Sequence, residues 1–359
     1  MTRALLLVGT PKGAFILESD ASRTDWSIRG PLCEGWPIHD VVYDARTGAI
    51  LAAGGSPWYG PAVWRSEDLG ATWTHSSAGL TYGDDADDPV KTAWSLAVGP
   101  DGAILAGVEP AGLFRSDDDG ATWTHVQGLT EHPTRPTWQP GNGGLILHTI
   151  VPHPTDSDRA WIGISAVGVF ETRDRGESWE PRNKGVRADY DPAIYPETGQ
   201  CVHKFAPAAG EPETLYQQNH CGMYRSIDGG LSWTDLSGNG LPSQFGFPLV
   251  AHPRDPATFW LIPLNGDQAG RFVPDGSAAV WRTHDRGDTW IRASDGLPQS
   301  SAWLSVLREA MARDTLDPVG VSFGTKSGQL WNSSDEGVSW RRITTDLPEI
   351  WAVEAVVLD

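Results

Sequence analysis

The chain has little cysteine and few basic residues. Its 359 residues include only 3 Cys, too few for the disulfide framework of a small secreted protein. Lysine and arginine together number 27 against 46 acidic residues, which gives a formal net charge of −19. Such an acidic chain offers no electrostatic footprint for a nucleic-acid backbone or an anionic membrane, so we expect neither as a partner.

Long apolar runs are also missing. The first apolar run, residues 4–8, ends at Gly9 and does not have the length or the flanking residues of a signal peptide. No run approaches the roughly 20 apolar residues that a membrane-spanning helix needs. We therefore expect a soluble, cytoplasmic protein, and the 18 Trp residues provide apolar surface for a well-packed core.

One octapeptide, Ser/Thr-x-Asp-x-Gly-x-Ser/Thr-Trp, recurs along the chain. Its six copies span residues 66–73, 116–123, 172–179, 226–233, 283–290 and 333–340. The Asp carboxylate can accept backbone N–H bonds, the Gly permits a positive φ, and the Trp can anchor the turn on neighbouring core. Each copy therefore predicts a tight turn between two antiparallel strands.

The segments around each octapeptide complete a repeated unit. Three short apolar runs precede each turn and one strand follows it, which predicts four antiparallel strands in about 50 residues. Residues 4–8, 13–17 and 26–28 match only the second to fourth strands of a unit, and the missing first strand is found at 351–356. The sequence thus predicts an all-β chain, 1–359, folded as a single seven-bladed β-propeller in which the C-terminal strand completes the N-terminal blade.

The octapeptide and its spacing resemble the BNR or Asp-box repeat propellers. This family includes bacterial sialidases, oligoxyloglucan-processing glycosidases, the sortilin ectodomain and a photosystem assembly factor. The resemblance implies that the six octapeptides are structural and lie on the face away from the active centre. The chain lacks the Arg-Ile-Pro segment of the sialidases, so the resemblance implies a fold and not sialidase activity.

The residues that begin the first strand of each blade should converge on one rim of the central channel. Aligning the units gives, for blades one to seven, Trp351, His39, Trp94, His148, His203, Phe247 and Trp303. Three of these seven positions are histidine. His220 ends the neighbouring second strand of blade five and should lie beside His203, because antiparallel neighbours bring those ends to one rim.

Converging imidazoles are typical ligands of a transition metal. We predict one Cu, Fe, Zn or Mn ion held by His39, His148 and His203, with His220 and Glu109 as catalytic groups. One alternative is that these histidines are structural residues of the channel that bond backbone carbonyls or water, and another is that a histidine acts as a general acid or base without metal.

Cys201 and Cys221 flank two of the histidines within one blade. They could supply a soft metal ligand or form a redox pair, and the alternative is that both are inert buried thiols.

Long loops between blades two and five, residues 79–92, 130–144 and 183–200, should surround this rim. Flat aromatic side chains beside arginine suit a saccharide or other small-molecule cleft. The predicted substrate-binding residues are Trp94, Trp138, Tyr190, Tyr195, Arg135, Trp303 and Trp351. Alternatively, the loop aromatics only fix irregular segments to the rim.

Three classes of function are consistent with these patterns. The first is a metal-dependent oxidoreductase or hydrolase that acts on a small organic or carbohydrate-like substrate. The second is a metal-free glycoside hydrolase or glycan-binding propeller, for which a carboxylate pair such as Glu109 and Asp189 would be needed. The third is a protein-interaction scaffold or assembly factor.

Overall fold

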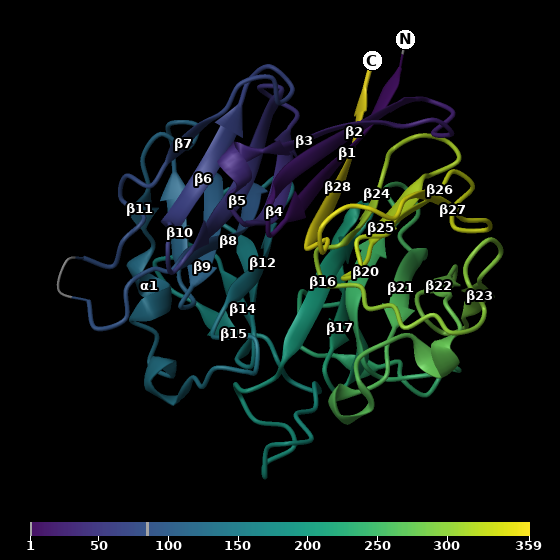
Figure 1. Ribbon diagram of the computed structural model, residues 1–359. Helices are drawn as coiled ribbons and strands as arrows, with labels where there is room; N and C mark the ends of the chain where they lie inside the picture. Colours follow the sequence, from purple (N-terminus) through teal and green to yellow (C-terminus); the bar gives the residue numbers. More distant parts are fainter. Residues whose placement is uncertain (1, 84–85) are drawn as a thin grey trace.

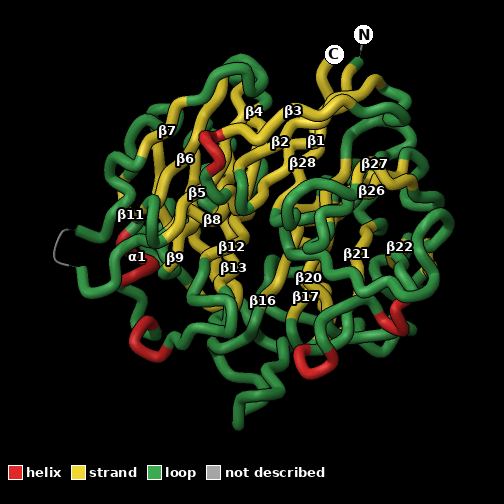
Figure 2. Tube along the Cα trace, viewed as in Figure 1, coloured by secondary structure: helices red, strands yellow, loops and turns green. Residues whose placement is uncertain are grey.

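Short segments with alternating apolar side chains form antiparallel strands throughout the chain. The computed structural model describes residues 2–83 and 86–359, and within them the strands form seven sheets of four strands each. The sheets are arranged around a central axis as the blades of a β-propeller, with loops at both ends of the strands (Figures 1 and 2). The predicted seven-bladed architecture is confirmed.

The blades follow the chain in order. Blade one contains β28 (Ala352–Leu358), β1 (Arg3–Thr10), β2 (Gly13–Asp20) and β3 (Ser27–Leu32). Blade two contains β4 (Ile38–Asp44), β5 (Ala49–Ser56), β6 (Gly60–Ser66) and β7 (Thr74–Ser76). Blade three contains β8 (Thr92–Val98), β9 (Ile104–Glu109), β10 (Leu113–Ser116) and β11 (Thr124–His125). Blade four contains β12 (Leu147–Pro152), β13 (Ala160–Ile164), β14 (Gly168–Thr172) and β15 (Glu180–Pro181).

The remaining blades have the same order of strands. Blade five contains β16 (Val202–Ala208), β17 (Glu211–Asn219), β18 (Gly222–Ser226) and β19 (Thr234–Asp235). Blade six contains β20 (Gly246–Ala251), β21 (Phe259–Pro263), β22 (Val280–Thr283) and β23 (Ile291–Ala293). Blade seven contains β24 (Met311–Arg313), β25 (Val321–Gly324), β26 (Leu330–Ser333) and β27 (Arg341–Thr344). The helical segments are α1 (Gln127–Thr130), η1 (Cys33–Gly35), η2 (Arg135–Thr137), η3 (Asp267–Ala269) and η4 (Pro274–Gly276).

The C-terminal strand closes the ring. Strand β28 pairs antiparallel with β1, with Val353 opposite Val8 and Leu358 opposite Arg3. The two chain ends therefore lie side by side in Figure 1. Because β28 forms the innermost strand of blade one, the predicted closure of the N-terminal blade by the C-terminal strand is confirmed.

Apolar layers between the blades form the core. Among the largest fully buried side chains are Trp64, Trp161 and Trp260, each from the second or third strand of a blade. One cluster joins Val8 of blade one to Phe323 of blade seven, so packing continues across the point where the ring closes. Within the described residues, no helix is both long enough and apolar enough to cross a membrane.

The six octapeptide turns have the same hydrogen bonds. In each, the first Ser or Thr hydroxyl donates to the Asp carboxylate and accepts the Gly N–H, and the second Ser or Thr donates its backbone N–H and hydroxyl to the same carboxylate. The six Gly residues have φ between 84° and 91°, a left-handed conformation that glycine adopts without strain. The turn is thus specified within eight residues.

Blade seven departs from the predicted alignment. The spacing predicts Trp303 at the start of its first strand, but that strand, β24, begins at Met311. Trp303 lies in an irregular segment before it, is 66% exposed and packs edge-on against Phe272. The alignment is wrong here because residues 303–310 do not form a regular strand, and the aromatic residue at 303 does not mark a strand start.

We predict that the Asp of an octapeptide turn contributes more stability than a neighbouring exposed acid. Asp285→Ala removes the acceptor for Thr283 Oγ1 and for the backbone N–H and hydroxyl of Thr289, which should lower the free energy of unfolding by about 1 kcal/mol. Asp288→Ala in the same turn should change it by less than about 0.5 kcal/mol, because Asp288 makes only an exposed ion pair with Arg225. Chemical denaturation of the three proteins measures both effects, and equal losses would contradict the prediction.

Candidate functional site

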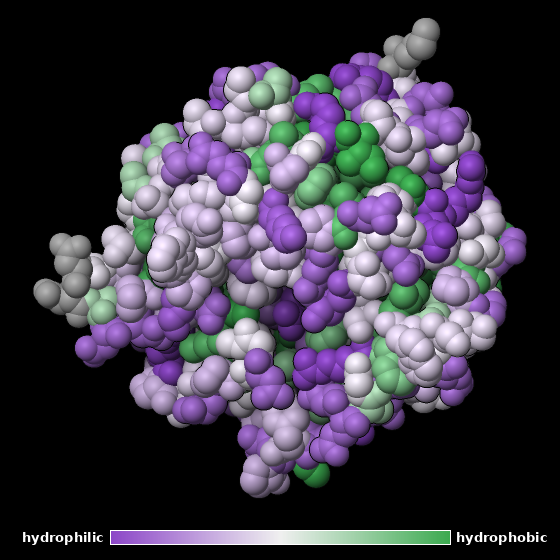
Figure 3. All heavy atoms as spheres, in the orientation of Figure 1, coloured by the Kyte–Doolittle hydropathy of each residue, from purple (hydrophilic) through white to green (hydrophobic). Residues whose placement is uncertain are grey.

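A cavity of about 920 Å³ opens where the first strands of several blades begin. All seven blades contribute residues to its lining, and so do the loops around residues 137–143 and 190–199. The lining includes His39, Trp138, His203 and Arg308. The space-filling view shows a hollow near the middle of the molecule, bordered by hydrophilic residues (Figure 3). Part of the set of functional residues predicted from the sequence lines this cavity.

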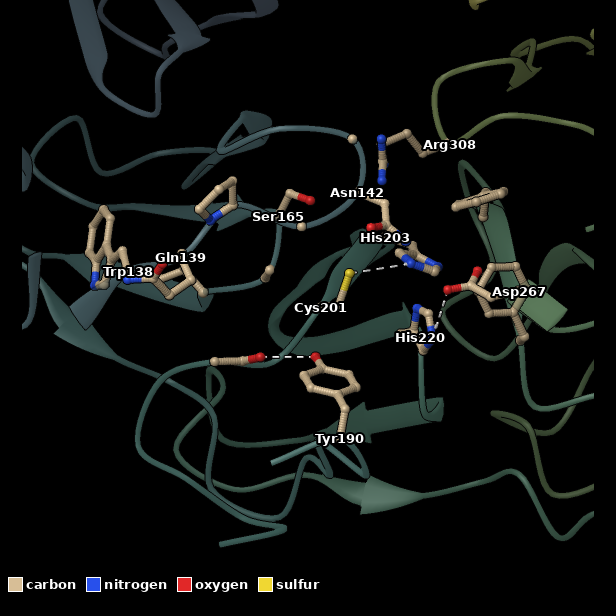
Figure 4. Close-up of a pocket in the computed structure, with 18 of the residues that line it drawn as sticks. Trp138, Gln139, Asn142, Ser165, Tyr190, Cys201, His203, His220, Asp267 and Arg308 are labelled. Carbon is tan, nitrogen blue, oxygen red and sulfur yellow. Dashed lines mark hydrogen bonds and ion pairs between the residues drawn. The ribbon is translucent and has the colours of Figure 1, made fainter. Parts of the chain in front are cut away.

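Three potential metal ligands gather on one wall of the cavity. Cys201 immediately precedes β16, His203 lies within it, and His220 follows β17. The pairing of Val202 with Asn219 and the hydrogen bond from His220 N to Cys201 O bring these residues together. One donor atom from each of the three side chains lies within 4.8 Å of the others (Figure 4). The prediction that His220 lies beside His203 is confirmed, with ring centroids 5.6 Å apart.

The hydrogen bonds of His203 leave one ring nitrogen free to act as a ligand. Its Nδ1 lies 2.5 Å from the carbonyl oxygen of Gly246, which can only accept, so Nδ1 carries the proton and Nε2 has the lone pair. Nε2 lies 3.6 Å from the Cys201 sulfur. Burial, followed by the positive charge of Arg308, lowers the pKa of His203 well below its ordinary value. The imidazole is therefore neutral at neutral pH.

His220 faces the same cavity from the other side of the cluster. Its Nε2 lies 3.6 Å from Asp267, and that carboxylate forms an ion pair with Arg271 at 2.5 Å. Tyr190 packs edge-on against the His220 ring and donates its hydroxyl proton to Gly199 O (Figure 4). Burial lowers the pKa of His220 and raises that of Cys201.

His39 lines the cavity but lies outside this group of potential ligands. Its ring is stacked between Trp94 and Trp351, at centroid distances of 4.2 and 4.8 Å. Its Nε2 lies 3.3 Å from Gly55 O, and burial lowers its pKa to about 4. His39 therefore forms part of an aromatic wall shared by blades one to three.

His148 is not exposed to the cavity. It is completely buried, its Nε2 bonds Val202 O of the next blade, and its Nδ1 lies 2.9 Å from Thr149 Oγ1. Both ring nitrogens are thus occupied. The structure groups His203 with His220 and Cys201 and not, as the alignment predicts, with His39 and His148.

The predicted substrate-binding residues divide into two sets. Trp94, Trp138, Tyr190 and Trp351 line the cavity. The residues outside its lining are Arg135, Tyr195, Trp303 and, among the predicted catalytic groups, Glu109.

Each of these four has a different environment. Arg135 donates to Ala111 O, while Tyr195 and Trp303 are 58% and 66% exposed. Glu109 ends β9, and burial raises its pKa.

The three cysteines are all unpaired, so Cys201 and Cys221 do not form a disulfide in this structure.

Arg308 and Glu309 line the cavity and are absent from the sequence-based site. They occupy the rim position of blade seven that the alignment gives to Trp303. Spacing alone does not locate them, because the rim residues of the other blades precede their octapeptide Trp by between 29 residues, at Trp94, and 43 residues, at Phe247. Asp267 is also missing from the prediction, because it begins the short helical segment η3, which no repeated pattern marks.

A buried group of charged residues adjoins the cavity through Glu309. Glu309 forms an ion pair with Lys204. Burial, together with the negative charge of Glu309, raises the pKa of Asp40 well above its ordinary value. Burial also raises the pKa of Glu354 to about 7, against the opposing effect of Arg313 and Lys204. The channel thus holds carboxyl groups that resist ionisation.

The comparisons with known proteins identify the fold. No protein-family model and no curated protein matches the chain. A structure of an ancestral GH74 enzyme matches with a TM-score of 0.58 and 16% identity, and the match covers 85% of this chain and 38% of that one. A structure of YCF48 bound to D1 peptide matches with a TM-score of 0.55 and 15% identity, and the match covers 90% of this chain and 87% of that one. A 6-phosphogluconolactonase-like protein from Bacteroides uniformis matches with a TM-score of 0.59 and 10% identity, and the match covers 99% of both chains.

We predict that Glu354→Gln alters how stability depends on pH. A carboxyl whose pKa is near 7 in the folded state and 4.5 otherwise binds more protons when folded, so its contribution to stability falls as pH rises from about 4.5 to above 7. Glutamine does not ionise. The free energy of unfolding of the variant, measured relative to wild type, should therefore be about 1 to 3 kcal/mol higher at pH 8 than at pH 5.

Denaturation at pH 5, 6, 7 and 8 measures this change. Glu67→Gln, at a side chain that is 72% exposed, is the control and should follow the wild-type profile. A constant difference between Glu354→Gln and wild type across this range would contradict the prediction.

Proposed function

We propose that the protein is a metal-dependent enzyme that acts on a small organic or carbohydrate-like molecule in the central cavity. The observation that carries this proposal is the convergence of Cys201, His203 and His220 on one wall of that cavity. Three protein ligands with space beside them are the usual arrangement of a catalytic metal, in which a further position is left for water or substrate.

The distance between Cys201 and His203 suits ligands of a single ion. Zinc bonds of about 2.3 Å to sulfur and 2.0 Å to nitrogen place tetrahedral ligands about 3.5 Å apart. The Cys201 sulfur and His203 Nε2 are separated by 3.6 Å. The hydrogen bond from Nδ1 to Gly246 O orients the imidazole, as partners of metal-ligating histidines commonly do.

The thiolate narrows the choice of metal. A ligand set of one sulfur and two imidazole nitrogens favours zinc or copper over manganese, because soft ligands prefer softer ions. Metal binding would replace the thiol proton of Cys201, whose pKa is raised by burial. A bound zinc ion would lower the pKa of a coordinated water and so supply a nucleophile at neutral pH.

Tryptophan side chains in the cavity lining suit a saccharide or a planar organic molecule. Trp94, Trp138 and Trp351 line the cavity, and aromatic rings commonly stack on sugar and other planar ligands. The GH74 neighbour is a glycoside-active propeller, which supports this class of substrate at the level of the fold. A metal-free glycosidase mechanism has less support, because Glu109 and Asp189 both lie outside the cavity lining.

We predict near-stoichiometric zinc or copper binding by the chain and its loss in ligand variants. Cys201→Ser and His203→Ala should each weaken metal binding by more than about tenfold, because each removes a direct ligand. Competition with a chelating indicator measures the affinity, and elemental analysis measures the metal content.

Cys221→Ser is the matched control, since Cys221 is a buried, unpaired thiol of the same blade that is not in the ligand group. It should bind metal as wild type does. A wild-type chain that binds neither zinc nor copper, or equal loss in Cys221→Ser and Cys201→Ser, would overturn the proposed function.

A further inference from the structure

Arg308 is a cation without a partner in the wall of the cavity. Among the described residues, no carboxylate lies within ion-pair distance of Arg308 and no protein group accepts a hydrogen bond from it. Its Nε is enclosed by protein and has no hydrogen-bond partner. Arg135 and Arg313 are half-buried without an ion pair, but each donates a hydrogen bond to a backbone carbonyl. Arg341 has neither kind of partner among the described residues, but it is exposed to water, whereas Arg308 is half-buried.

Such an arrangement is costly for the folded protein. The enclosed Nε of the guanidinium loses hydration, and no carboxylate or carbonyl replaces it there. Burial accordingly lowers the pKa of Arg308. In a chain with a formal net charge of −19, carboxylates are abundant, so the absence of a partner at this position needs a reason.

The surroundings of Arg308 leave its charge available to the cavity. Its guanidinium carbon lies 5.5 Å from the ring centroid of Phe247, and that of Arg271 lies 6.0 Å from the same centroid. Arg271 is neutralised by Asp267. Figure 4 shows the guanidinium end of Arg308 pointing toward Asn142 and His203, on the side of the cavity that holds the ligand group.

We propose that Arg308 binds a carboxylate group of the substrate, so that the substrate is a small organic acid held beside the metal ligands. This inference rests on the proposed function for the role of the metal, but the carboxylate site itself can be tested without metal. The substrate anion would supply the partner that the protein does not provide.

The geometry favours a carboxylate over a phosphate. A single guanidinium presents a planar fork that matches the two oxygens of a carboxylate. A phosphate carries more charge and would need a second cation that is free to bind it. The neighbouring cations are not free, because Arg271 is paired with Asp267 and Lys204 is paired with Glu309.

Benzoate and benzamide are suitable probes, because they have nearly the same shape and differ in charge. Calorimetric titration of the metal-free full chain, prepared with a chelator, should show benzoate binding at least about tenfold tighter than benzamide, the factor expected for a charge-assisted pair of hydrogen bonds. Inorganic phosphate should displace benzoate only weakly. In Arg308→Gln the preference for benzoate should disappear, and in Arg308→Lys it should be reduced.

Arg341→Gln, which removes an exposed arginine away from the cavity, is the control and should keep the wild-type preference. Arg308→Gln should melt at the same temperature as wild type or higher, because it removes an uncompensated charge. A substantially lower melting temperature would show a structural role for Arg308 and would overturn the proposal. Equal binding of the two probes by wild type, or an unchanged preference in Arg308→Gln, would also overturn it.

The metal experiment separates this inference from the proposed function. Arg308→Gln should still bind metal, and Cys201→Ser should still prefer benzoate. If the wild-type chain prefers benzoate but binds no metal, the carboxylate site is supported and the proposed metal-dependent function is contradicted. If the chain binds metal but shows no preference for benzoate, only the proposed carboxylate site is contradicted.

Discussion

Closure of the ring depends on the pairing of its two chain ends. Strand β28 pairs with β1 and completes a blade that the N-terminal residues alone cannot form. The same segment contributes to the rim: Trp351 N donates to Gly9 O, and Val353 N donates to Glu309 O of blade seven. A propeller blade has exposed edges until its neighbours are in place. The pairing that closes the fold therefore also positions two walls of the cavity.

The fold could be predicted from the sequence because its signals are local. The octapeptide contains its own donors and acceptors, so the turn around Asp68 forms the same bonds as the turn around Asp335 in a different blade. The alternation of apolar side chains marks the strands on either side. The missing first strand at one end and the surplus strand at the other then leave one simple arrangement, a closed ring.

The site could be predicted only where regular strands carry it. His203 and His220 come from adjacent strands whose pairing follows from the repeat, so their proximity was accessible to sequence reasoning. Arg308 comes from an irregular segment and Asp267 from the short segment η3, and in neither does a repeat period relate a residue to a direction in space. The aromatic character of Trp303 was a misleading signal, because exposed aromatic residues occur in loops as well as at strand starts.

The difference between His148 and His203 shows why residue type alone does not identify a ligand. Each occupies an equivalent position, and each donates a ring proton to a backbone carbonyl beyond its own blade. His148 uses Nε2 for that bond and turns Nδ1 toward Thr149, so no nitrogen remains. His203 uses Nδ1 instead, which directs Nε2 toward Cys201 and the cavity. The same interaction between blades thus leaves no free ring nitrogen in one case and an available one in the other, and the choice between them depends on side-chain rotation set by packing.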